Sequence, residues 1–371
     1  ENVRKSELTR EKQRLLWEEK KMVDKNFCMS SYLAFRYIEK DGYEFYDGLK
    51  HTGDMPYPED RKVLVKNAED VAKAYKEAFE SKSNVELGIL LSGGMDSACL
   101  AAFMKPGTDA YTFRFLGGNF STEDMERAKL YAEKYHLNLH YVDIDWSVVE
   151  RNLEPLMKMK GAPVHSIEPQ IMEAALQAKA DGVEMMVAAD GSDLVFGGMD
   201  RMLSKDWKFE EWVDFYTFLD PKIALKNPVD MSYLFERYRL PENNIDYLKF
   251  IDDVFAHESS ASYCNAFITA GMKYTPFFDP SGMVKMAEPL DLKRIRSGES
   301  KYIIRNLFKM CYPEIPVPEK TPMPRPVDAY FKDWEGPKRP EFREDIDMSK
   351  LTGNQKWQLY CLEKFLDMNE K

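Results

Sequence analysis

Short apolar runs alternate with amphipathic stretches through the middle of the chain. Buried strands are predicted where these runs lie, at 85–91, 110–115, 139–143 and 185–189. Helical periodicity follows the strands: it begins near Asp96, covers 121–135, begins again near Ser147, and recurs before the fourth strand. This alternation predicts an α/β fold with a parallel sheet that is covered by helices on both faces. Since such sheets bind ligands beyond the carboxyl ends of their strands, we expect chemistry in the loops after the first and fourth strands.

The flanking regions have different patterns. The first region predicts a charged helix at 1–25, an aromatic-rich stretch at 27–46, a turn region at 53–58 and a helix from about Asn67. After about Asp200 the pattern is mainly helical, with helices predicted at 207–218, 231–238, 245–255, from near Ser300, and from about Asn354 after a proline-rich stretch at 313–326. We therefore expect an N-terminal accessory segment (1–82), an α/β domain (83–325) and a C-terminal helical extension (326–371).

Composition narrows the class of protein. Hydrophobic residues make up 44% of the 371 residues, as in a folded globular protein, and no apolar run has the length of a membrane span. The formal net charge is −11 without a basic cluster, which disfavours a nucleic-acid partner. The opening stretch lacks the apolar centre of a secretory signal, so a cytoplasmic location is expected.

Cysteine and histidine offer no metal-binding pattern. The 5 cysteines lie far apart without a C-x-x-C pair, and the 5 histidines are also dispersed. We expect reduced thiols, and we expect any catalytic metal to be held by oxygen atoms.

The most informative motif joins the first predicted strand to its helix. It reads Ser92-Gly93-Gly94-Met95-Asp96-Ser97. The glycines let the backbone turn tightly and bring its N–H groups towards an anion, and the start of the following helix adds partial positive charge. The motif therefore predicts a phosphate-binding loop. An ordinary strand-to-helix turn capped by Asp96 is the plainer alternative.

The loop lacks the Gly-Lys-Ser/Thr ending of a Walker A motif, and no such ending occurs elsewhere in the chain. A kinase or an enzyme that cleaves the γ-phosphate is therefore disfavoured.

The string S-G-G-M-D-S resembles the pyrophosphate-binding loop of the ATP-pyrophosphatase superfamily, whose members adenylate a carbonyl or carboxyl oxygen. Further segments are similar to motifs of the synthetase domain of the asparagine synthetase family, in the same order along the chain: A-D-G-S-D-L-V-F-G-G at 189–198, P-F-F-D at 276–279, K-Y-I-I-R at 301–305 and P-E-K at 318–320. The resemblance covers most of residues 85–325 and implies the ATP-pyrophosphatase type of parallel sheet.

The resemblance also implies the reactants and their binding residues. A substrate carboxylate attacks the α-phosphorus of ATP and expels pyrophosphate, with Mg²⁺ balancing the charge. Asp96 and Asp193 are the expected Mg²⁺ ligands, although each alone is also a common helix cap. The nucleotide and its pyrophosphate are expected at Leu90, Ser92, Gly93, Gly94, Asp96, Ser97, Phe113, Gly191 and Lys320.

Two side chains have catalytic roles in this comparison. Lys301 is expected to neutralise charge in the transition state, although a lysine that opens a helix is usually solvated. Asp190 takes the position where the family has an acid, or a tyrosine in β-lactam-forming members, and is expected to orient or deprotonate the incoming amine. A turn residue before glycine is the alternative for Asp190.

The chain also departs from the family pattern. The roughly 85 residues before the loop are too few for the family's glutaminase domain and show no N-terminal cysteine, so the nitrogen is expected from free ammonia, an amine substrate or a partner subunit. Met272 and Tyr274 stand where asparagine synthetases have an acidic and a basic residue, and Leu194 replaces a glutamate. Apolar and aromatic side chains do not pair with the charges of an amino acid, so free aspartate is disfavoured against a bulkier carboxylate.

The leading hypothesis is therefore an amide-forming ligase that joins a small carboxylate to ammonia or an amine. Lactam formation within one substrate is the alternative among enzymes. RNA thiolation or lysidine-type modification is disfavoured, because it calls for a basic surface or a persulfide cysteine. A non-catalytic nucleotide-binding paralogue is the alternative outside enzymes. Three roles stay open for residues 1–82: a dimer interface, a substrate lid or a remnant of a replaced domain.

Overall fold

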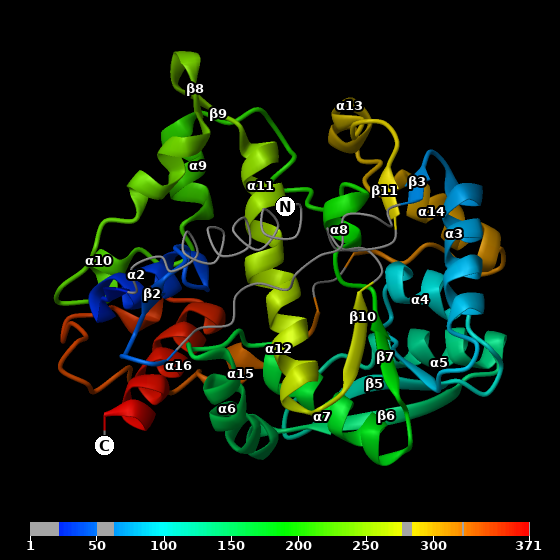
Figure 1. Cartoon of the computed structure of the whole chain (residues 1–371), viewed down its shortest axis with the longest axis horizontal. Coiled ribbons are helices and arrows are strands. Elements are labelled where there is room, and N and C mark those ends of the chain that lie inside the picture. The colour runs from blue at the N-terminus through cyan, green and yellow to red at the C-terminus, as the bar shows by residue number, and fades with distance from the viewer. Residues whose placement is uncertain (1–21, 50–62, 277–283, 321–322, 371) are drawn as a thin grey trace, which may run out of the picture.

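A five-stranded parallel sheet forms the centre of the molecule (Figure 1). The computed structural model describes residues 22–49, 63–276, 284–320 and 323–370. In spatial order the strands of the sheet are β10 (Lys273–Pro276), β7 (Met185–Ala188), β4 (Leu87–Leu90), β5 (Asp109–Phe115) and β6 (Asn138–Ile144). The strands β4 and β7 pair directly, with Ile89 opposite Val187, so the loops that follow these two strands lie beside each other.

Alternate residues of the strands belong to two separate cores. Leu90 and Tyr111 pack in one apolar cluster, whereas Ile89, Leu91 and Ala110 pack in the other. One face of the sheet is covered by α3 (Ala68–Ser81), α4 (Met95–Ala101), α5 (Glu123–Tyr135) and α14 (Tyr302–Cys311). The opposite face is covered by α6 (Trp146–Lys160), α7 (Glu168–Ala180) and α12 (Ala261–Thr269). The sheet is thus covered on both faces, as the apolar character of its strands predicts.

The remaining described helices are short or lie away from the sheet. They are α2 (Lys25–Phe35), α8 (Ser192–Val195), α9 (Phe209–Tyr216), α10 (Pro221–Ala224), α11 (Tyr247–Phe255), α13 (Leu292–Arg296), α15 (Val327–Tyr330) and α16 (Gly353–Asn369). A π-helical turn, Ala256–Ser260, connects α11 to α12. Single-turn π segments within helices often occur at functional sites.

Among the described residues, six further strands form small two-stranded pairs outside the central sheet. The pairs are β1 (Met22–Val23) with β2 (Tyr43–Glu44), β3 (Val63–Val65) with β11 (Val284–Met286), and β8 (Arg239–Leu240) with β9 (Asn244–Ile245). Segments with the geometry of a 3₁₀ helix are Ser232–Tyr238, Pro241–Asn243 and Met348–Lys350.

Helices from the two ends of the described chain pack together. The blue α2 lies beside the red α16 in Figure 1. The Tyr32 hydroxyl donates to the Val164 carbonyl at 2.9 Å, and the Gln358 side chain donates to the Tyr32 carbonyl at 2.9 Å. The Lys25 ammonium adds ion pairs with Glu341 at 2.5 Å and Glu370 at 2.6 Å. These contacts fix α2 to the α6–α7 connection and to the C-terminal helix.

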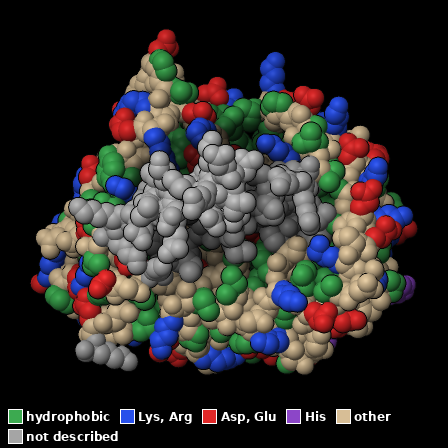
Figure 2. All heavy atoms as spheres, in the orientation of Figure 1, with side chains coloured by type: hydrophobic (Ala, Val, Ile, Leu, Met, Phe, Trp, Pro, Cys, Tyr) green, Lys and Arg blue, Asp and Glu red, His purple; other side chains and the backbone are tan. Residues whose placement is uncertain are grey.

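Positive and negative side chains are interspersed among the described residues of the face drawn in Figure 2, and its hydrophobic side chains are scattered. Within the described segments, no helix combines the length and the apolar character that crossing a membrane requires.

The predicted α/β class is confirmed, and so are the four predicted strands and the helices between them. The fifth strand, β10, was not predicted. A helix over 1–25 is wrong at Met22–Val23, which pair as a strand, and the rest of that prediction and the turn region at 53–58 lie outside the described residues. The helix predicted at 231–238 has 3₁₀ geometry. The predicted domain limits stay predictions.

Candidate active site

The loop after β4 is held in shape by its own serines. The Ser97 hydroxyl accepts from the Ser92 backbone N–H at 3.1 Å and lies 3.0 Å from the Ser92 hydroxyl, which in turn accepts from the Gly94 N–H at 3.1 Å. Gly94 caps α4 with extended backbone and without a side-chain cap. The first turn of α4 therefore points its N–H groups beyond the end of the sheet, which is the arrangement that binds phosphate.

Glycine is required at position 93 because the backbone of α5 comes very close to it. A Cβ on Gly93 would lie 2.6 Å from the Asp124 Cα atom at the start of α5, so only a residue without a side chain fits here. The Tyr131 hydroxyl of α5 also donates to the Gly93 carbonyl at 3.2 Å. The helix α5 thus fixes the position of this loop.

A lysine joins the two aspartates that follow β4 and β7. The Lys301 ammonium lies 2.6 Å from Asp96 Oδ2 and 2.5 Å from Asp193 Oδ1. The Ser192 hydroxyl donates to the other Asp96 oxygen at 2.6 Å. The Lys320 ammonium lies 3.0 Å from Asp193 and also contacts the Gly198 carbonyl. Charged groups from four distant parts of the sequence therefore converge on one point.

Burial and charge act in opposite directions on these groups. Burial disfavours the ammonium of Lys301, whose side chain is 3% exposed, but the carboxylates of Asp96 and Asp193 outweigh it and raise the pKa of Lys301. Burial likewise opposes the charge of Asp193, but Lys301 and then Lys320 outweigh it and lower the pKa of Asp193. Lys301 and Asp193 are therefore both ionised at neutral pH.

The backbone around Lys301 is adapted to this position. Lys301 precedes α14 with φ 51°, in the left-handed region, which costs a non-glycine residue about 1 kcal/mol. A Cβ on Gly198 would collide with Lys301 Cε and Asp193 Oδ1. Glycine at this position of the predicted A-D-G-S-D-L-V-F-G-G motif thus leaves room for the lysine and the aspartate to meet.

A cavity of about 230 Å³ opens over these groups. Its polar lining comes from the loop after β4 and from the charged residues described above. Its apolar and backbone lining includes Leu90, Tyr111, Thr112, Phe113 and Phe115 from β4 and β5, and Tyr263, Met323 and Pro324 from the opposite side. The apolar lining can hold the flat aromatic base of a nucleotide, and the loop after β4 can hold its phosphates.

Asp190 lies at the end of β7 and is buried. Its Oδ1 accepts a hydrogen bond at 2.9 Å from the hydroxyl of Ser259, which belongs to the π-helical turn before α12. The next turn of that helix carries Tyr263, whose pKa is raised, mainly by burial and then by the Asp190 carboxylate. Asp190 and Tyr263 are therefore neighbours beside the lysine and aspartate cluster.

The donor set for a metal consists of two carboxylates. Within the described residues, no group of three or more histidine, cysteine, aspartate or glutamate side chains is placed to hold a metal ion. The two carboxylates at Lys301 are hard oxygen ligands, and Mg²⁺ is often held by one or two carboxylates together with substrate phosphates. Asp96 and Asp193 thus fit Mg²⁺ that binds with a nucleotide, and that ion would compete with the Lys301 ammonium for both carboxylates.

The structure brings most of the sequence-predicted residues to one cavity. Its lining includes Leu90, Ser92, Gly94, Asp96, Ser97, Phe113, Asp193, Lys301 and Lys320. Gly93, Asp190 and Gly191 are not part of the lining: Gly93 packs against α5, Asp190 bonds to Ser259, and Gly191 opens α8 with φ 84°. Gly93 and Gly191 thus shape the site through their backbone, whereas Asp190 is buried directly beside it.

Several residues of the site were not predicted from sequence. Ser192 and Asp124 had a usable signal, because they lie within or directly against the predicted loops. Ser259, Tyr263 and Met323 had none, since only the tertiary packing of α12 and of the chain before α15 brings them here.

The predicted P-F-F-D motif is only partly visible. Pro276 ends β10, and Phe277 to Asp279 lie outside the described residues. Met272 is buried, and the ring of Tyr274 stacks on Phe267 of α12 with 4.5 Å between ring centroids. Apolar and aromatic packing therefore occupies the positions where asparagine synthetases have charged residues.

Comparisons with known proteins agree with the motifs. The family model described as asparagine synthase matches residues 70–262. Among curated proteins, asparagine synthetase [glutamine-hydrolyzing] 2 of Bacillus subtilis (strain 168) is 36% identical over 151 residues, which are 37% of this chain and 20% of that protein. The match thus spans about a fifth of that relative's length. Among solved structures, NMN synthetase from Francisella tularensis matches with a TM-score of 0.28 and 13% identity, over 70% of this chain and 100% of the other.

Proposed function

Because the chain belongs to the asparagine synthase family, we propose that it is an ATP-dependent carbon–nitrogen ligase that adenylates a substrate carboxylate and passes the acyl group to ammonia or an amine. The observation that carries this proposal is the meeting of Asp96, Asp193 and Lys301 beside the phosphate-binding loop. A site that only binds nucleotide has no need for a buried lysine held between two carboxylates.

In the first step, an oxygen of the substrate carboxylate attacks the α-phosphorus of ATP, and the bond to the β-phosphate breaks, releasing pyrophosphate. The N–H groups at the start of α4 and the hydroxyls of Ser92 and Ser97 hold the departing pyrophosphate. The Lys301 and Lys320 ammonium groups stabilise the negative charge that develops on the phosphates. Mg²⁺ held by Asp96 and Asp193 would supply further charge neutralisation when bound.

In the second step, the amine nitrogen attacks the acyl carbon, AMP leaves, and the nitrogen loses a proton. Asp190 is the group proposed to accept that proton, because its carboxylate is buried beside the site and is oriented by the Ser259 hydroxyl. The nitrogen comes from free ammonia, an amine substrate or a partner subunit.

Free aspartate is not the proposed acyl substrate. The stacked rings of Phe267 and Tyr274 and the buried Met272 give an amino acid's α-amino and α-carboxylate groups no partner at these positions. A larger carboxylic acid is favoured.

The test is release of pyrophosphate and AMP from Mg·ATP across a panel of carboxylic acids, each with and without ammonium. We expect carboxylate-dependent AMP and pyrophosphate, and Asp96→Asn should lower the rate on the order of 100-fold. Asp143→Asn, which removes an exposed carboxylate paired with Arg114, is the matched control and should keep the rate.

Formation of ADP in place of AMP would contradict the proposal, and equal rates for Asp96→Asn and the wild type would contradict the assignment of Asp96. Turnover of one carboxylate without any added amine would identify lactam formation within that substrate.

A further inference from the structure

A second charged cluster lies next to the cavity and has no part in the chemistry proposed above. It consists of Arg36, His165, Glu258 and Arg325, and we call it the arginine cluster. These residues come from the end of α2, the α6–α7 connection, the π-helical turn and the chain just before α15. Arg325 directly follows Met323 and Pro324, which line the cavity, and Glu258 directly precedes Ser259, which holds Asp190.

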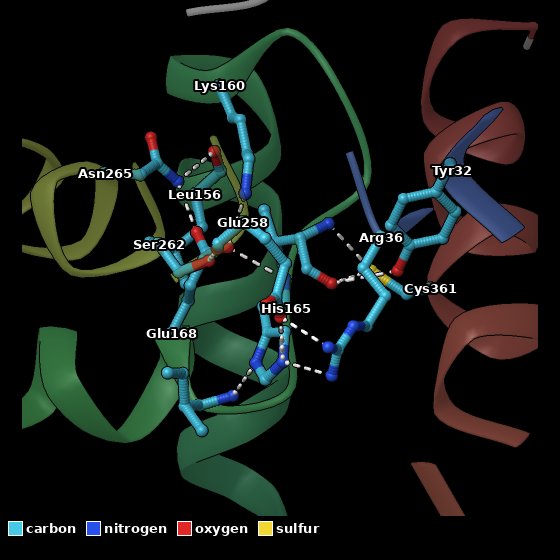
Figure 3. A network of polar contacts seen from close by, with 12 residues as sticks. Tyr32, Arg36, Leu156, Lys160, His165, Glu168, Glu258, Ser262, Asn265 and Cys361 are labelled. Carbon is cyan, nitrogen blue, oxygen red and sulfur yellow. Dashed lines mark hydrogen bonds and ion pairs between the residues drawn. The ribbon is translucent and has the colours of Figure 1, made fainter. Parts of the chain in front are cut away.

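The arginine cluster is built around one imidazole. The guanidinium groups of Arg36 and Arg325 each lie 3.4 Å from Nε2 of His165. Arg36 also forms an ion pair with Glu258 at 2.9 Å. In Figure 3 the Arg36 side chain reaches from the edge of α2 towards His165, with Glu258 close to the same ring.

The tautomer of His165 follows from the hydrogen bond that its Nδ1 atom accepts. Its Nδ1 atom accepts the backbone N–H of Ile167 at 3.2 Å, so the proton of the neutral ring is assigned to Nε2. The acceptor on the same side of the ring is Glu258 Oε1, which lies 3.4 Å from Nε2. His165 therefore cannot accept a hydrogen bond from either guanidinium.

Positive charge consequently exceeds negative charge in the arginine cluster. Within the described part of the chain, Glu258 is paired with Arg36, and the remaining polar contact of Arg325 is the Ser166 hydroxyl at 3.4 Å. The nearby Glu168 does not compensate, because it is buried against Lys160 at 2.7 Å and Asn265 at 2.6 Å, as Figure 3 shows. Burial lowers the pKa of Arg325 and the charge of Arg36 lowers it further, and these effects outweigh the opposite effects of Glu258 and Tyr263.

Two guanidinium groups with one carboxylate form a site that gains stability from a bound anion. Guanidinium is the side chain best suited to carboxylate and phosphate, because its N–H groups match two oxygens at once. The pKa of Tyr263, which lines the cavity, is raised by burial and by Asp190 and is lowered by the charge of Arg325. Arg325 also directly follows Met323 and Pro324 of the lining, so the arginine cluster lies close to this part of the cavity.

We propose that Arg36 and Arg325 bind an anionic group, a carboxylate or a phosphate, that the acyl substrate carries in addition to the carboxylate that is activated. The assignment of this anion to the acyl substrate rests on the proposed function. It narrows the substrate class to carboxylic acids with a second negative charge. The π-helical turn then serves both ends of the substrate, since Glu258 orients Arg36 and Ser259 orients Asp190.

The test measures anion binding with the nucleotide site already filled. The full chain is saturated with Mg²⁺ and α,β-methylene-ATP, which is not cleaved at the α-phosphate, and its thermal unfolding is followed while phosphate or acetate is added at constant ionic strength against chloride. We expect a saturable rise in melting temperature. Phosphate and acetate serve as separate probes, and the anion that binds more tightly identifies the kind of group that the subsite takes.

Arg325→Met should weaken binding of the better anion at least tenfold. Arg151→Met removes an arginine away from the arginine cluster, paired with Glu173 at 2.6 Å, and should leave anion binding unchanged. If Arg325→Met does not unfold cooperatively, the same anion-binding measurement is made on Arg36→Met.

The proposal would be overturned if the melting temperature rose equally in the wild type and in the arginine-cluster variants, or if it rose with neither anion. Failure of the proposed function appears separately, as the absence of any stabilisation by the nucleotide analogue before an anion is added.

Discussion

At the scale of single residues, charge pairing explains why the predicted site residues meet. The Lys301 ammonium lies 2.5–2.6 Å from Asp96 and Asp193, so three residues that the motifs single out meet in the structure, and their roles stay predictions. The sequence did not predict the left-handed backbone of Lys301 or the hydrogen bond from Ser192 to Asp96, because both depend on how α8 and α14 dock on the sheet. Residue identity thus indicated which side chains to consider, and packing determined their geometry.

His165 gives a prediction on pH. Burial, followed by the charges of Arg325 and Arg36, lowers the pKa of His165 well below its usual value. Below about pH 6.5 the unfolded chain therefore takes up a proton that the folded chain does not, and the free energy of unfolding falls by up to about 1.4 kcal/mol per pH unit from this group. Above that pH the effect is absent.

The measurement is urea unfolding of the wild type and of His165→Gln at pH 7.5 and pH 5.5. We expect the wild type to lose more stability than the variant between the two values. An equal loss in both proteins would show that His165 does not remain neutral when the protein is folded.

At the scale of elements, the apolar runs predicted the strands well where the strands are central. The strand β10 was missed because Lys273-Tyr274-Thr275-Pro276 has no apolar run and lies at the edge of the sheet, where burial demands less. The π-helical turn and the helix α12 were not predicted either, since the predicted helix ended at residue 255. The elements that the pattern predicts least are therefore an edge strand and the segment that carries Ser259 and Tyr263.

The two glycines of the phosphate-binding loop give a matched pair of variants. Gly93→Ala places a methyl group 2.6 Å from the backbone of α5, so the loop and the helix must separate, at a cost of about 1–3 kcal/mol. Gly94→Ala meets the Ser92 hydroxyl at 3.3 Å and should cost less than 1 kcal/mol. Chemical denaturation of both variants measures the difference. Equal destabilisation would contradict the close approach of α5.

At the scale of the whole molecule, the two ends of the described chain pack together next to the arginine cluster. Helix α2, which lies in the predicted accessory segment, packs against α16 of the predicted C-terminal extension and carries Arg36 to the arginine cluster. Sequence patterns did not indicate this, because the contact between Tyr32 and Gln358 joins positions at opposite ends of the chain. Such long-range packing has no local signal.

The central claim is that a carboxylate oxygen attacks the α-phosphorus of ATP. The most direct measurement uses the carboxylic acid that supports turnover, labelled with ¹⁸O in its carboxyl group, and mass spectrometry of the nucleotide and phosphate products. We predict that one ¹⁸O atom is transferred to AMP, because the acyl–oxygen bond breaks when the amine attacks. Label found in inorganic phosphate, with ADP as the nucleotide product, would contradict the account.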